Sequence, residues 1–229
     1  MSYLDRNTYE KLYARYVGDN ARPISDLMQH AGDLTGKCVL DLCGGAGAIA
    51  VAAKKKGAAK VVLMDGDTNM SDSKMLNRNG IECYYTSVNS YLYNVPIFTP
   101  YDVVFCRQAV NYWLTEQNAE MIARKMNPGG LFIFNTFANE PSHIPTVKEY
   151  KLDGHSFVEI SWRCGSTVHH VQCRDGLPPH TTKFEYISPD EFISWLHPHF
   201  HIDVFTREKS VVYSCKKKLS KEDVQKQLF

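Results

Sequence analysis

The chain lacks the features that mark most secreted, membrane-spanning and nucleic-acid-binding proteins. It has 26 Lys and Arg residues against 25 Asp and Glu, a formal net charge of +1, so no general attraction to a polyanion is expected. No apolar run approaches the roughly 20 residues of a membrane-spanning helix. No basic segment followed by an apolar one opens the sequence. These absences predict a cytoplasmic protein that binds neither membrane nor nucleic acid.

The chain also lacks a cysteine framework. Its seven cysteines are scattered and form no C-x-x-C pair, which is atypical of structural disulfides or a zinc site. The run His197-Pro-His199-Phe-His201 suggests metal binding, but no Cys or carboxylate cluster accompanies it. A second conceivable metal set combines His169 or His170 with His180 and an acid such as Glu159 or Glu185. We predict that the protein holds no metal.

What is present is a regular alternation of apolar runs and helix-like segments. Apolar residues make up 44% of the 229-residue chain, enough for a sizeable core. Strands are expected at residues 37–41, 60–64, 82–86, 102–106 and 131–134, and helices at 47–56, 69–79 and 116–126. Residues 126–130, Met-Asn-Pro-Gly-Gly, are expected to form the turn before the fifth strand. This alternation predicts βαβ units around a parallel sheet covered on both faces.

The alternation of strands and helices is confined to residues 35–139, which we interpret as the cofactor-binding core. Residues 140–187 alternate polar and apolar side chains between glycines, which predicts an antiparallel β-hairpin insertion over the substrate. Residues 188–216 are expected to form a helix capped by Ser188 and then a closing hairpin. Residues 217–229 are interpreted as a charged tail.

Residues 1–34 are expected to be helical. One face repeats aromatic and apolar side chains at a spacing of three to four: Tyr9, Leu12, Tyr13 and Tyr16. This face either packs on the main body or belongs to a lid. In the second case its tyrosines, or Arg15 and Arg22, would close over a ligand.

The most informative stretch is Val39-Leu-Asp41-Leu-Cys43-Gly44-Gly45-Ala-Gly47. A buried strand, a glycine turn and the start of a helix present free backbone N–H groups to a ligand. The spacing Gly45-x-Gly47-x-x-Ala50, with Asp65 twenty residues later, also fits a dinucleotide fingerprint. However, the Asp41 carboxylate would repel a pyrophosphate, whereas a cationic ligand would tolerate it. An NAD(P)-dependent oxidoreductase therefore stays only as an alternative.

This stretch resembles the D-x-G-x-G-x-G motif of the class I S-adenosylmethionine-dependent methyltransferases. Cys43 stands where the first glycine is usual. The segments at 64–67, 101–108 and 126–131 resemble further motifs of the same family in the same order. The resemblance implies an α/β fold with a Rossmann-like seven-stranded, mostly parallel sheet whose last strand is antiparallel, plus the antiparallel β insertion. It also implies that S-adenosyl-L-methionine lies across the carboxyl ends of the strands.

The resemblance assigns a role to each of two carboxylates. Asp65 would bind the ribose hydroxyls, and Asp41 would favour the ammonium group of the methionine part through water or backbone amides. Alternatively, Asp41 only caps the next helix. The full set of expected cofactor-binding residues is Tyr16, Arg22, Asp41, Cys43, Gly44, Gly45, Gly47, Asp65, Gly66, Asp67, Met70, Val88, Asn89, Cys106 and Arg107.

The substrate is expected to meet residues 107–113, residues 135–139 and the hairpin insertion. Tyr112 either lines this wall or packs the next helix together with residues 113–114. His169 and His170 are adjacent on a presumed strand, so only one of them can face the cofactor. The candidate catalytic residues are His169, His170, His180 and Tyr112, with a histidine as general base or polar anchor.

These observations favour methyl transfer to a small polar metabolite or natural-product intermediate, whose acceptor atom (O, N or C) they leave open. The Asn-Pro-Pro-Tyr motif of enzymes that methylate nucleic-acid bases is absent. A homodimer is possible. A non-catalytic protein that only binds a nucleotide cofactor is a further alternative.

Overall fold

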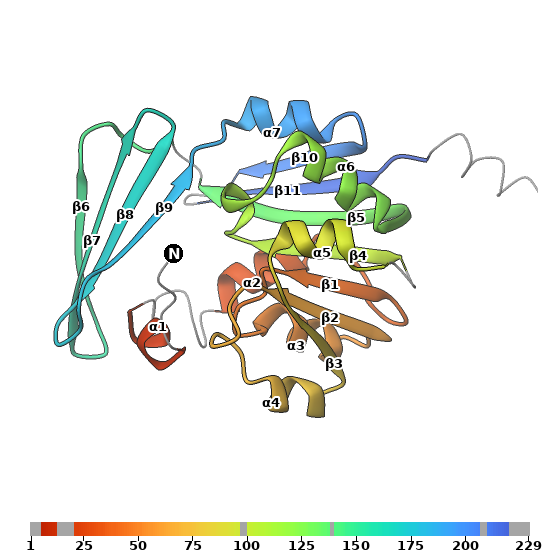
Figure 1. Ribbon diagram of the computed structural model, residues 1–229, viewed down its shortest axis with the longest axis horizontal. Helices are drawn as coiled ribbons and strands as arrows, with labels where there is room; N and C mark the ends of the chain where they lie inside the picture. Colours follow the sequence, from red (N-terminus) through yellow and green to blue (C-terminus); the bar gives the residue numbers. More distant parts are fainter. Residues whose placement is uncertain (1–5, 13–20, 97–99, 138–139, 207–209, 220–229) are drawn as a thin grey trace, which may run out of the picture.

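The computed structural model describes residues 6–12, 21–96, 100–137, 140–206 and 210–219. Two sheets dominate it (Figure 1). The larger has seven strands in the order β10-β11-β5-β4-β1-β2-β3, and the smaller has four in the order β6-β7-β8-β9. The expected Rossmann-like fold with an added antiparallel β insertion is therefore confirmed.

The larger sheet is parallel except at its last strand. Its members are β1 (Cys38–Leu42), β2 (Lys60–Asp65), β3 (Ile81–Tyr85), β4 (Tyr101–Arg107), β5 (Met126–Phe137), β10 (Phe200–Thr206) and β11 (Ser210–Lys217). Strand β11 runs antiparallel to both β5 and β10. Because both faces are buried, the central strands are continuous apolar runs, as expected for a covered parallel sheet.

Helices cover both faces of this sheet. They are α2 (Ala21–Met28), α3 (Ala48–Lys55), α4 (Ser73–Arg78), α5 (Val88–Asn94), the 3₁₀ helix η2 (Val110–Tyr112), α6 (Glu116–Arg124) and α7 (Pro189–Leu196). Helix α1 (Arg6–Leu12) instead contacts β8 of the smaller sheet. Alternate residues of β1 enter two different cores: Leu40 packs with α5, α6 and α7, and Val39 packs with α2 and α3 (Figure 1). Ser188 caps α7 through a capping box with Glu191, as the sequence predicted.

Three expectations of local structure need correction. Helix α5 was not predicted, although Ser87 caps it and Tyr91 and Leu92 bury one face. The helix expected at 69–79 is shorter, because the Asp72 side chain accepts a hydrogen bond from the Met75 N–H and starts the helix there. Residues 126–130 belong to β5 rather than to a turn before it.

The N-terminal expectation is met only in part. The described residues of the helical segment form two separate helices, α1 and α2. Tyr13, Arg15 and Tyr16 lie outside the described residues, as do the side chains of Tyr9 and Arg22, so their expected roles stay predictions.

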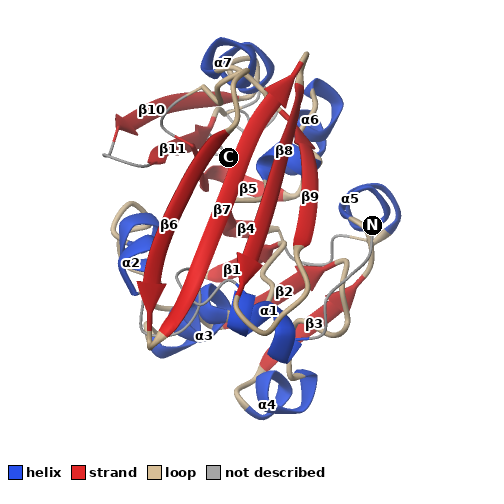
Figure 2. Ribbon diagram, turned by 90° about the vertical axis from the view of Figure 1, so that its left-hand side faces the viewer, coloured by secondary structure: helices blue, strands red, loops and turns tan. Residues whose placement is uncertain are grey.

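The smaller sheet is a chain of antiparallel hairpins: β6 (Thr146–Leu152), β7 (His155–Cys164), β8 (Thr167–Arg174) and β9 (His180–Glu185). Asp153 and Gly154 both have positive φ, 51° and 78°, the combination found in tight two-residue hairpin turns. Viewed from its outer side, this sheet stands in front of the core, with α1 beneath it (Figure 2). It therefore has one face toward the core and one face toward solvent.

No helix within the described ranges is both long and apolar enough to cross a membrane.

Candidate active site

The glycine turn follows β1 and leads into α3. Gly45 and Gly47 have positive φ, 54° and 80°, and Gly47 is the N-cap residue of α3. A Cβ atom at Gly44 would lie 2.8 Å from the carboxyl of Asp41, and one at Gly47 would lie 2.8 Å from Leu76 Cδ2. The turn therefore has no room for side chains at these positions, which only glycine can occupy.

Cys43 adopts the conformation that glycine would adopt. Its φ is +57°, in the left-handed region, which costs a non-glycine residue about 1 kcal/mol. The side chain packs against the core that contains Cys106. Contact with the Cys106 thiol and burial both raise the pKa of Cys43 well above its ordinary value, so it stays a neutral thiol. The departure from the family motif thus leaves the path of the turn intact but strained.

Asp41 lies beneath the turn and is 1% exposed. Its Oδ2 accepts a hydrogen bond of 2.9 Å from the N–H of Ala50, in the first turn of α3. Burial raises the pKa of Asp41 to about 7, against the opposing effects of the Ala50 N–H and the Arg107 charge. The structure therefore gives Asp41 the helix-capping contact, and any effect on a ligand passes through the backbone that it holds.

Asp65, at the end of β2, connects that strand to the glycine turn. Its Oδ2 accepts from the Gly45 N–H and its Oδ1 from the Asp67 N–H, both at 2.8 Å. Asp67 is buried and accepts from the Asn69 N–H in turn. A carboxylate has about four lone-pair sites, so Asp65 keeps acceptor capacity for a diol. Burial is the main reason that its pKa is raised.

The other residues expected to contact the cofactor differ in how close they lie to this turn and in how far they are buried. Met70 approaches it from the loop after β2: its Cε would lie 3.9 Å from a Cβ at Gly45. Gly66 is exposed in the same loop, and Val88 begins α5. Cys106 is fully buried in β4. The Oδ1 of Asn89 accepts a hydrogen bond from Asn118 of α6, so this side chain is partly engaged elsewhere.

A second strained residue lies where β4 ends. Gln108 has a φ of +54°, and its N–H donates to Oδ1 of the buried Asn135 at 3.0 Å. Asn135 lies on β5 beside Arg107. Strained backbone that is held by a buried partner is typical of functional sites. Both residues lie within the segments 107–113 and 135–139 that the sequence predicted to meet the substrate, although neither was named individually.

Three aromatic rings join the core to the smaller sheet. Phe184 of β9 packs edge-on against Tyr112 and stacks on Phe137, with ring centroids 5.4 and 5.6 Å apart. Tyr112 and Phe137 remain 46% and 51% exposed, whereas Trp113 and Leu114 are buried in the core. The two interpretations of this loop, lining the substrate wall and packing the next helix, therefore each hold for different residues. Tyr112 lies on a surface wall, and its two successors pack the helices.

The two adjacent histidines of β8 point to opposite sides. His170 shares its face with the buried side chains of Val168 and Gln172, the face that meets the core. His169 lies on the outer face, where its ring stacks on Trp162 at 4.8 Å. We therefore drop His169 as a catalytic candidate. Strand pairing places His180 opposite Gln172, on the inner face.

The inner face also carries a polar cluster that the sequence did not reveal. The Tyr150 hydroxyl donates to Oε1 of Glu159 at 2.8 Å, and Nε2 of Gln172 donates to the Tyr150 hydroxyl oxygen at 3.2 Å. The Ser161 hydroxyl lies 2.9 Å from Nδ1 of His170. Burial lowers the pKa of His170, while the Glu159 carboxylate opposes this shift, so the ring is neutral at neutral pH.

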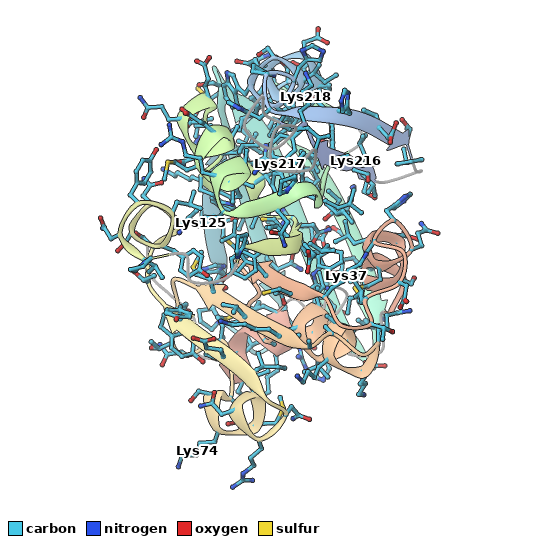
Figure 3. The ribbon with its side chains drawn as sticks, turned by 90° about the vertical axis from the view of Figure 1, so that its right-hand side faces the viewer. Lys37, Lys74, Lys125, Lys216, Lys217 and Lys218 are labelled. Carbon is cyan, nitrogen blue, oxygen red and sulfur yellow. The ribbon has the colours of Figure 1, made fainter. Side chains whose placement is uncertain are left out.

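Six lysines lie on the side of the molecule opposite the smaller sheet. Figure 3 labels them: Lys37, Lys74, Lys125, Lys216, Lys217 and Lys218. Three of them donate to backbone carbonyl oxygens: Lys125 to Val95, Lys217 to Met126 and Lys218 to His197. The glycine turn holds the carboxylates of Asp41, Asp65 and Asp67, which suits a cationic ligand.

In the part of the chain that the structure describes, no three or more His, Cys, Asp or Glu side chains are placed to hold a metal ion. Neither of the conceivable histidine-containing sets forms such a group.

The sequence matches a family model described as a methyltransferase domain, over residues 13–207. No curated protein matches the chain.

Several solved structures share the fold. An S-adenosylmethionine-dependent methyltransferase from Clostridium acetobutylicum aligns with a TM-score of 0.70 at 16% identity, covering 93% of this chain and 97% of its own. CalS10, an amino pentose methyltransferase from Micromonospora echinaspora solved with S-adenosylmethionine bound, aligns with a TM-score of 0.66 at 13% identity, covering 93% and 99%. The sugar N-methyltransferase KedS8 from Streptoalloteichus aligns with a TM-score of 0.66 at 11% identity, covering 95% and 96%.

Proposed function

The chain belongs to the methyltransferase-domain family, and we propose that it methylates a small polar metabolite or natural-product intermediate. Its methyl donor is S-adenosyl-L-methionine, which supplies a methyl group on a positively charged sulfur. The family match to a methyltransferase domain speaks against the two alternatives, an NAD(P)-dependent oxidoreductase and a non-catalytic cofactor-binding protein.

The described residues fit this cofactor. Side chains of Asp41 and Leu76 fill the space beside Gly44 and Gly47. A Cβ at Gly45, by contrast, would have Met70 Cε, at 3.9 Å, as its nearest described neighbour, so the cofactor would approach the turn at Gly45. The fixed Asp65 carboxylate would accept hydrogen bonds from the ribose diol. Arg107 and Met70 lie at the rim of the same turn, and the nearby carboxylates favour a cation.

The observation that carries the choice of a small acceptor is the smaller sheet. Its inner face lies over the carboxyl ends of the core strands and places the neutral imidazole of His170 among polar and aromatic side chains. An in-line displacement requires mainly that the acceptor is held in position and shielded from water. CalS10 is described as an amino pentose methyltransferase and KedS8 as a sugar N-methyltransferase. Both descriptions are consistent with a compact polar acceptor.

In this proposal, His170 removes the proton of the acceptor group, and Ser161 orients its ring through Nδ1. Because burial lowers the pKa of His170, the base stays deprotonated below the ordinary histidine value of about 6.5. His180 and Tyr112 are candidate substrate contacts, from β9 and from the loop after β4.

The test is transfer of a radioactive methyl group from S-adenosylmethionine to a panel of small amines, alcohols and sugars. We expect label in the small-molecule fraction, and a kcat roughly 10²-fold or more lower in His170→Gln, a typical loss for a general base. The acidic limb of the pH profile should disappear in the same variant. His169→Ala, on the outer face, is the matched control. Label found only in protein or nucleic acid would contradict the proposal.

A further inference from the structure

Three side chains on the inner face of the smaller sheet form a hydrogen-bonded chain that leads to the proposed base, His170. Glu159 is buried, and its Oε1 accepts from the Tyr150 hydroxyl at 2.8 Å. The Tyr150 oxygen in turn accepts from Nε2 of the buried Gln172 at 3.2 Å. Gln172 follows His170 by two residues on the same face of β8. The chain therefore runs from a buried carboxylate to the side chain next to the imidazole.

The chain has a fixed direction, because a carboxylate can only accept hydrogen bonds. The single hydroxyl proton of Tyr150 goes to Glu159, so the Tyr150 oxygen can bind only the NH₂ end of the Gln172 amide. The carbonyl end, Oε1, is thereby turned away from Tyr150. Among the residues that the structure describes, Oε1 has no partner of ordinary hydrogen-bond geometry. A buried polar atom without such a partner requires an explanation.

Protonation of His170 would supply the missing donor. A neutral imidazole has one N–H group, whereas an imidazolium has two. Nδ1 of the ring already lies 2.9 Å from the Ser161 hydroxyl. A hydrogen bond with Gln172 favours the charged ring, against the lowering of the His170 pKa by burial. The Gln172 carbonyl is thus an acceptor that gains its donor when the ring takes up a proton.

The proposed reaction creates this charged ring. The acceptor group gives its proton to His170 and takes the methyl group, so the positive charge that leaves the sulfur ends on the imidazole. A cation removed from water is costly unless it is paired and hydrogen-bonded. Among the described charged groups near the ring, Glu159 of β7 favours its charge, whereas Lys148 of β6 and His180 of β9 oppose it. Gln172 lies between the ring and the Tyr150–Glu159 pair.

We propose that Gln172 is a positioning residue for His170: its carbonyl, oriented by Tyr150 and Glu159, accepts a hydrogen bond from the protonated imidazole. The chain stabilises the ring in the form that it takes after removing the proton of the acceptor group. This inference rests on the proposed function, which gives the protonated ring its role in turnover. Unlike that function, the pairing can be measured on the protein without substrate.

An NMR titration of the histidine rings tests the inference, with the His170 signal identified by its absence in His170→Gln. In Gln172→Leu, which removes the acceptor, we expect the pKa of His170 to fall by roughly one pH unit, as for a lost hydrogen bond to a charged group. Gln172→Glu keeps an acceptor toward the ring, so the pKa should stay at or above the wild-type value. Tyr150→Phe frees the amide to turn and should lower the pKa by a smaller amount.

The pH dependence of turnover gives a second readout that a merely structural role would not move. For an acceptor found in the radioactive assay, the acidic limb of kcat/KM reports the free enzyme. In Gln172→Leu this limb should move to lower pH by the same amount as the NMR titration, because a base with a lower pKa stays deprotonated further down. Cys173→Ala, next to Gln172 but on the outer face of β8, should match the wild type in both readouts.

An unchanged pKa of His170 in Gln172→Leu would overturn the inference, and so would an equal fall in Cys173→Ala. If Gln172→Leu does not fold, an unchanged pKa in Tyr150→Phe overturns it instead. If small molecules are methylated but the pKa does not respond, only this inference fails. If the pKa responds but no small molecule accepts the methyl group, the proposed function fails and the pairing stands.

Discussion

The glycine turn of the larger sheet and the inner face of the smaller sheet pair their polar groups in different ways. At the turn, Asp41, Asp65 and Asp67 each accept hydrogen bonds from backbone N–H groups. On the inner face, the bonds of Tyr150 and Gln172 join side chain to side chain. At the turn these side chains hold the path of the backbone, so exchanging one of them disturbs the turn itself. A site built from side chains can be retuned by single substitutions, which suits a constant cofactor facing a particular substrate.

The largest expected effect concerns the buried carboxyl of the turn. The folded-state pKa of Asp41 is raised to about 7, above an unfolded value of about 3.9. The folded state therefore holds a proton that the unfolded state loses, and Asp41 destabilises the protein progressively as pH rises from about 4 to about 7. Asp41→Asn, which keeps an acceptor for the Ala50 N–H, should escape this loss of about 4 kcal/mol.

Urea unfolding of both proteins at pH 4.5, 6 and 8 checks this prediction. The difference in free energy of unfolding should move in favour of Asp41→Asn as pH rises. A difference that stays constant across this range would show that Asp41 is not buried as a proton-holding group.

The next prediction compares glycines from the two regions. Gly47 and Gly176 have nearly the same φ, 80° and 77°, but only at Gly47 would a Cβ meet another group, Leu76 at 2.8 Å. Alanine at Gly176 should cost about 1 kcal/mol for the backbone alone. Alanine at Gly47 should cost about 3 kcal/mol, because overpacking adds to the backbone term.

Thermal or chemical denaturation measures both costs, and calorimetry with S-adenosylhomocysteine measures the affinity. Gly47→Ala should weaken binding as well as stability, whereas Gly176→Ala should leave binding unchanged. Equal losses of stability at the two glycines would mean that the turn tolerates a side chain.

The smallest effect concerns Cys43, whose φ of +57° is strained for a cysteine. Cys43→Gly should recover up to about 1 kcal/mol of that strain, less the packing lost against the core. Its melting temperature should therefore stay within a few degrees of the wild type, and affinity for S-adenosylhomocysteine should be kept. A large destabilisation would show that the thiol's packing beside Cys106 outweighs the strain.

Much of the core could be predicted from the sequence, because apolar strands and glycine turns have local signals. The turn from Cys43 to Gly47 and the strand ending at Asp65 were predicted at their places, and Ser188 was predicted as a cap. Helix α5 was not predicted because Asn and Ser residues interrupt its apolar pattern, although Ser87 stood in the sequence as a possible cap.

The substrate side could be predicted only in outline. Strand periodicity shows that His169 and His170 face opposite ways, but which side meets the core depends on how the hairpins dock. The contact of Tyr150 with Gln172 joins residues 22 positions apart on strands that are not neighbours, so no local pattern contains it. Such contacts become visible only when the strand register is known.

The most direct test of the division between cofactor turn and substrate face is a calorimetric titration with S-adenosylhomocysteine of three proteins: wild type, Asp65→Asn and Gln172→Leu. Loss of a charge-assisted hydrogen bond, about 1.5–3 kcal/mol, should weaken binding to Asp65→Asn roughly 10- to 100-fold. Gln172→Leu should bind with wild-type affinity. Wild-type affinity in Asp65→Asn, or an equal loss in both variants, would contradict the account.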